Sequence, residues 1–133
     1  MKRWQGIIGV EGVWSVDGRK ALPEAFTWAD LPIPLQDNGN RPAGQFANIG
    51  TVETIERVPG AGPGEFVLIA TGTVEGALPA DLAPCIAADS MVNDFLEPDD
   101  ENPLHRIIAT SARIRAVYFG VPAWPACIAE EMS

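Results

Sequence analysis

The sequence predicts an α+β fold that is mainly antiparallel β, with a small curved sheet or barrel and two or three short helices. Three observations lead to this prediction. Long segments alternate apolar and polar residues with the period of two that is typical of a strand. The 12 Pro and 13 Gly residues are spread along the chain, which suits short strands and turns better than a helical bundle. A few segments that contain or begin with Pro have the composition of short helices.

Strands are expected in four places along the chain. Residues 6–14 carry apolar side chains on both faces, so we predict a central strand that is covered on both sides. Residues 48–58 and 65–74 alternate and are separated by the Gly/Pro-rich residues 59–64, which predicts an antiparallel hairpin. Residues 104–120 are rich in Ile, Val, Tyr and Phe and predict one long strand or a bent pair.

Turns and short helices are expected between these strands. Asp17 and Gly18 both tolerate the positive φ of a tight reversal. Pro at a first helical position predicts a short helix over residues 23–30, and the chain is expected to end in another over residues 125–131. Residues 78–88 favour only a short helix or turn, because Pro84 interrupts them.

Length and charge set limits on the class of protein. The 133 residues are enough for one domain with a real core, so residues 1–133 are interpreted as a single domain. A formal net charge of −9 argues against nucleic acid and against an anionic membrane surface as partners. Because the chain has no run of about 18 apolar residues and no signal-peptide pattern, we expect a soluble protein made in the cytoplasm.

Metal and cofactor sites are not indicated. Cys85 and Cys127 lie far apart in sequence without a local pattern, and we interpret both as small buried residues, with a disulfide left open as the alternative. The acidic residues 95–103 lack the spacing of a calcium loop and are interpreted as a solvated loop. His105 is the only His, and one His with two distant Cys makes no zinc pattern. No metal and no cofactor is therefore expected.

Two ends of the chain resemble a known family. Val-Asp-Gly-Arg at residues 16–19 is followed by Leu-Pro-Glu-Ala-Phe-Thr-Trp at 22–28 and Leu-Pro-Ile-Pro-Leu at 31–35. These motifs, together with the strand and Pro-Ala-Trp-Pro turn of residues 111–128, resemble the capsid maturation (prohead) proteases of tailed phages that infect actinobacteria. The resemblance implies the fold of the herpesvirus assemblins.

The same resemblance implies that the catalytic residues are lost. The family's His corresponds to a position within residues 41–46, where Ala43 stands at a degenerate position and no side chain can accept a proton near neutral pH. The family's nucleophilic Ser corresponds to Ala87, with Ser90 offered by an alternative register. His105 and Ser111 remain as residual candidates, but on one extended strand they would lie roughly 20 Å apart, beyond hydrogen-bond reach.

The leading hypothesis is therefore a non-enzymatic virion protein with a protease-like fold that binds and stabilises the capsid shell. Its partner would be the major capsid protein, and we expect a homo-oligomer located in the virion after synthesis in the host cytoplasm. Two alternatives stay open: an active maturation protease with an unusual triad, and an unrelated small-molecule-binding β-barrel. Aromatic, Pro and Gly residues offer rigid contact surfaces, so the predicted binding residues are Trp4, Asn38, Arg41, Pro42, Phe46 and Trp124.

Overall fold

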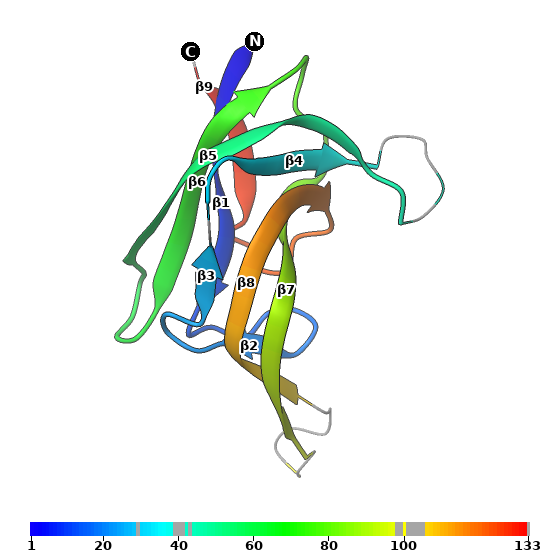
Figure 1. Ribbon diagram of the computed structural model, residues 1–133. Coiled ribbons are helices and arrows are strands. Elements are labelled where there is room, and N and C mark those ends of the chain that lie inside the picture. Colours follow the sequence, from blue (N-terminus) through cyan, green and yellow to red (C-terminus); the bar gives the residue numbers. More distant parts are fainter. Residues whose placement is uncertain (29, 39–41, 43, 98–99, 101–105, 133) are drawn as a thin grey trace.

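A computed structural model describes residues 1–133 except 29, 39–41, 43, 98–99, 101–105 and 133. Its described part forms one sheet of nine strands. The strands are β1 (Lys2–Glu11), β2 (Arg19–Ala21), β3 (Phe26–Trp28), β4 (Ile33–Asp37), β5 (Ala47–Pro59), β6 (Phe66–Val74), β7 (Ala83–Leu96), β8 (Arg106–Gly120) and β9 (Ile128–Met132). Figure 1 shows that the sheet curls on itself into a half-barrel.

The sheet is mixed rather than antiparallel throughout. β9, β1, β6, β5 and β4 pair antiparallel in that order. Along one edge of β8, the short strands β2, β3 and β4 then pair in parallel with successive parts of that long strand. β7 pairs antiparallel along the other edge of β8. One long strand therefore organises almost half of the sheet.

The prediction of an α+β fold is wrong, because the described residues contain no helix. Within the segment 23–30, residues 26–28 form β3, and these residues favour strands. The preceding backbone also bonds to a distant strand, because Ala25 O accepts a hydrogen bond from Ala112 N, 3.0 Å away. Within residues 78–88, where a short helix or turn was predicted, a turn is present at Ala80 and Asp81, but residues 83–88 belong to β7, which pairs with β8. The segment 125–131 leads into β9, which pairs with β1. In each case pairing with a distant strand overrides the local preference.

Other sequence predictions are confirmed. Residues 48–58 and 65–74 fall in β5 and β6, which form the predicted antiparallel hairpin. Residues 106–120 make one long strand. The reversal at Asp17 and Gly18 is present, with Gly18 at a φ of 82° and Ser15 N donating to Arg19 O.

The hydrophobic core draws on most strands of the sheet. Its largest fully buried side chains include Trp4, Ile8, Leu35, Leu68 and Ile114. The indole N–H of Trp4 is satisfied, because Nε1 donates to Thr51 O at 3.0 Å. The core thereby fixes the frame on which the loops and the β7–β8 hairpin are displayed.

Candidate binding cleft

A cleft of about 490 Å³ opens between β2, β7, β8 and the segment after β8. Its walls are mostly apolar, and polar side chains line part of it. The lining residues include Ser15, Val16, Asp17, Arg19, Lys20, Phe26, Cys85, Ile86, Ala88, Met91, Tyr118, Val121 and Trp124. Three of the apolar ones are strongly exposed, with exposed fractions of 70% for Val16, 44% for Met91 and 81% for Val121. The cleft therefore has apolar residues on its solvent-facing side as well as within it.

A tight turn fixes the polar side chains of one wall. Ser15 is buried, and its Oγ donates to Asp17 Oδ1 while accepting a hydrogen bond from Arg19 N at 2.9 Å. Asp17 Oδ2 lies 3.3 Å from Arg19 Nε. The turn is tied to the opposite segment, because Val16 N donates to Ala123 O. The guanidinium of Arg19 is thus held at the cleft while remaining 57% exposed.

Tyr118 and Cys85 come from paired positions of β8 and β7. Burial raises the pKa of Tyr118, and the neighbouring Cys85 raises it further. The charge of Arg19 lowers the pKa of Tyr118 and that of Asp17 raises it, so both charges act on this phenol. The phenol stays protonated at neutral pH, and its hydroxyl is hydrogen-bonded to the side chain of Cys85.

The two cysteines are buried and free, as the interpretation of the sequence expected. Burial raises the pKa of Cys85, whose Sγ donates to Val121 O at 3.3 Å. Burial also raises the pKa of Cys127, to about 11. Because the thiolate is the nucleophilic form, neither thiol is activated for covalent chemistry.

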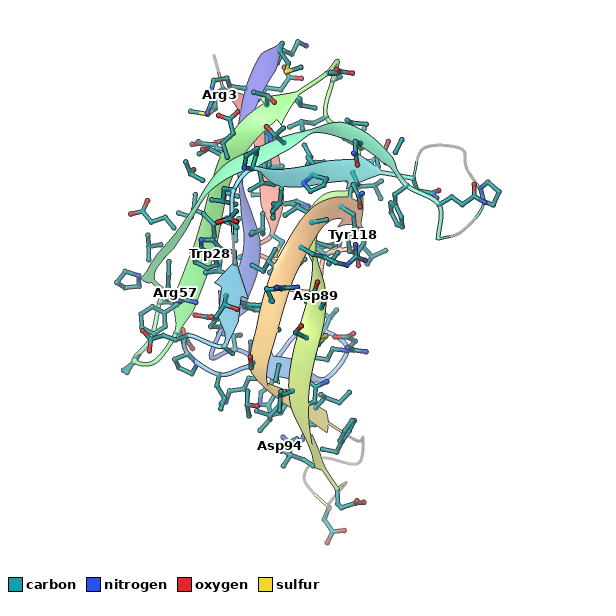
Figure 2. The ribbon with its side chains drawn as sticks, viewed as in Figure 1. Arg3, Trp28, Arg57, Asp89, Asp94 and Tyr118 are labelled. Atoms are coloured by element: carbon teal, nitrogen blue, oxygen red, sulfur yellow. The ribbon has the colours of Figure 1, made fainter. Side chains whose placement is uncertain are left out.

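A second surface lies next to the cleft, on the hairpin of β7 and β8. Figure 1 shows this hairpin extending past the rest of the sheet, and Asp94, labelled in Figure 2, lies on the extended part. Val92 and Phe95 have exposed fractions of 56% and 71%. Phe95 is paired with Ile107, which is paired in turn with Arg19, so their side chains share one face. We name Met91, Val92 and Phe95 the hairpin surface.

The most deeply buried charge lies elsewhere and is fully satisfied. Glu11 has no exposed surface, and its carboxylate binds Arg57 Nε at 2.6 Å and Nη2 at 2.9 Å. It also accepts hydrogen bonds from the backbone N–H groups of Glu24 and Phe26. Hydrogen bonding to Glu11 raises the pKa of Arg57, whose guanidinium lies 5.4 Å from the Trp28 ring. Figure 2 shows Arg57 and Trp28 together beside β3, where they hold this strand against its neighbours.

The predicted catalytic positions that the structure describes all lie on the hairpin of β7 and β8. Ala87 lies on β7 opposite Ala116, and Ser90 is exposed at a bulge with a φ of 52°. Ser111 lies on β8 opposite Val92. Next to Ser90, the pKa of Asp89 is lowered by hydrogen bonds from Arg113, which binds it at 2.8 and 3.1 Å. Ala43 and His105 lie outside the described residues.

The predicted binding residues are divided between core and surface. Trp4 and Trp124 are wrong as contact sites, because their exposed fractions are 0% and 8% and Trp124 Nε1 donates to Val13 O. Pro42 and Phe46 are exposed, and Asn38 is half-buried with its side chain bonded to Pro42 O. Phe46 packs edge-on against Tyr118, with ring centroids 5.4 Å apart. Arg41 lies outside the described residues.

Sequence reasoning missed the cleft. The turn itself was predicted from Asp17 and Gly18, but nothing in that stretch indicates that Cys85 and Tyr118 line the same cleft. The hairpin surface was missed as well, because residues 78–88 were predicted as a short helix or turn and residues 95–103 as a solvated loop, whereas residues 83–96 form β7.

Comparisons with family models, with curated proteins and with solved structures find no match for this chain. Within its described part, the protein has no helix long and apolar enough to cross a membrane. Among the same residues, there is no group of three or more His, Cys, Asp or Glu side chains that could hold a metal ion.

Proposed function

We propose that this chain is a non-enzymatic virion protein of a tailed phage that binds and stabilises the capsid shell, with the major capsid protein as its partner. The observation that carries the proposal is the hairpin surface, where apolar side chains stand exposed on a hairpin that extends beyond the sheet. Exposed apolar residues of this kind mark sites of protein association. The capsid as partner rests on the resemblance of the two chain ends to the prohead proteases.

The place of contact differs from the one that the sequence suggested. Trp4 and Trp124 are buried, so the side chains that can enter a partner's pocket are those of the hairpin surface. The hairpin carries charges of both signs: Asp89, Asp94 and Glu97 on one side and Arg106, Arg113 and Arg115 on the other, with Asp89 already bound by Arg113. The contact with the capsid is therefore expected to be mainly apolar.

Sedimentation of capsids with the purified protein tests the proposal. The protein is expected to pellet with the particles at about 0.1 M and at about 1 M salt, because an apolar contact survives a Debye length reduced from roughly 10 Å to 3 Å. The double variant Val92→Ser with Phe95→Ser is expected to bind at least about tenfold more weakly, since each apolar side chain contributes about 1.5–3 kcal/mol when buried.

The matched control is Ile128→Ser, which removes an apolar side chain of 64% exposure from β9 at the other end of the sheet. Its binding is expected to equal that of the wild type. Complete release at high salt, or equal binding by the hairpin variant, would contradict the proposal. Cleavage of capsid or scaffold chains in the same mixture would favour the alternative of an active protease.

A further inference from the structure

We propose that the cleft is a binding site for an amphipathic carboxylate, a small organic molecule with an apolar body and one carboxylate group. The inference concerns the cleft and does not depend on capsid docking. Its first support is size, because about 490 Å³ falls within the roughly 300–1,000 Å³ of small-ligand pockets. Phe26, Ile86 and Trp124 provide apolar walls for the body of such a molecule.

The charged side chains that line the cleft favour an anionic ligand over a cationic one. The charged side chains that line the cleft are Arg19, Lys20 and Asp17, so two cations and one anion leave a local charge of +1. This balance is opposite to that of the whole chain, whose formal net charge is −9. A ligand cation would be repelled here, whereas a ligand anion would be attracted.

Both cations, Arg19 and Lys20, keep hydrogen-bond donors for a ligand. The ion pair of Arg19 with Asp17 is made through Nε, which leaves the terminal amino groups of the guanidinium for a ligand. Lys20 has no carboxylate partner among the described residues, and its Nζ lies 5.4 Å from the ring of Trp14. A carboxylate fits the planar fork of a guanidinium through two parallel hydrogen bonds.

The turn around Ser15 holds the guanidinium in place before a ligand arrives. Ser15 Oγ bonds both Asp17 and the backbone of Arg19, so the arginine loses less freedom on binding than a free surface arginine would.

Calorimetry with three probes of one chain length tests the inference: octanoate, octanol and octylammonium. Octanoate is expected to bind about tenfold more tightly than octanol, and octylammonium more weakly than octanol, because a charge-assisted hydrogen bond is worth about 1.5–3 kcal/mol. Arg19→Gln is expected to weaken octanoate about tenfold and to leave octanol unchanged. Arg115→Gln, which removes an exposed cation of β8 outside the cleft, is the matched control and should change neither.

A second pair of variants tests whether the ligand binds in the cleft. Ala88→Phe fills the cleft and is expected to abolish binding of octanoate and octanol, whereas Ala80→Phe, at an exposed position outside the cleft, should not. Far-UV circular dichroism verifies that the variants remain folded. Absence of octanoate binding to the wild type, equal affinity for octanoate and octylammonium, or unchanged octanoate affinity in Arg19→Gln would each overturn the inference. Because the hairpin surface is intact in Arg19→Gln, capsid sedimentation of that variant reports on the proposed function separately.

Discussion

Glu11 shows how one residue can join strands that are distant in sequence. Glu11 is the last residue of β1. Its carboxylate binds the guanidinium of Arg57 on β5 and accepts hydrogen bonds from two backbone N–H groups, those of Glu24 and Phe26, around the start of β3. Arg57 Nη2 also donates to Phe26 O at 2.6 Å. Every partner of this buried charge is a strong donor, which is the condition under which a buried ion is tolerated. The pair therefore positions β3, and with it Phe26 in the wall of the cleft.

The variant Glu11→Gln tests this role. It removes the buried anion and leaves the Arg57 guanidinium, which is 22% exposed, without a counter-ion. The free energy of unfolding is expected to fall by about 3 kcal/mol. Glu53→Gln is the control, because its partner Arg3 is 48% exposed and such surface pairs contribute less than about 1 kcal/mol. Urea unfolding measures both, and equal losses in the two variants would contradict the assignment.

At the scale of elements, the hairpin of β5 and β6 was predictable and the short strands with distant partners were not. The hairpin is local, so alternation and the Gly/Pro-rich residues 59–64 define both strands and their reversal. β3 and β9 are short and have helix-like signals, and their partners β8 and β1 lie about a hundred residues away. Local patterns carry no information on such pairings, which is why three segments were predicted as helices or turns.

The backbones of β5 and β6 approach each other closely at Gly72, and this predicts the effect of a substitution there. A Cβ at Gly72 would lie 1.8 Å from Thr51 O and 3.0 Å from Trp4 Nε1, so Gly72→Ala would displace the ladder and the buried indole. We expect a loss of about 3 kcal/mol in the free energy of unfolding, the amount typical of overpacking at a buried position. Gly76→Ala is the control: it meets open space and should cost only about 1 kcal/mol for its φ of 73°. Equal losses in urea unfolding would show that the close approach is unimportant.

At the scale of the whole molecule, long-range strand pairing creates the cleft. The cleft combines residues 15–21 with residues 85–91 and 118–124, because β2 and β7 both pair with β8. Of the candidate residues, the sequence indicated Phe46, which packs on Tyr118 beside the cleft, but it misassigned Trp4 and Trp124. A Trp in sequence is equally suited to a core and to an interface, and only the packing around it decides between them.

Amide hydrogen exchange on protein bound to capsids tests the central claim, capsid docking through the β7–β8 hairpin, most directly. Bound and free protein are compared residue by residue under one salt condition. Because docking removes the hairpin from water, we expect added protection in residues 91–96 and the paired residues 106–111, and unchanged exchange in β9. Protection in residues 36–46 or β9, with none in the hairpin, would contradict the account.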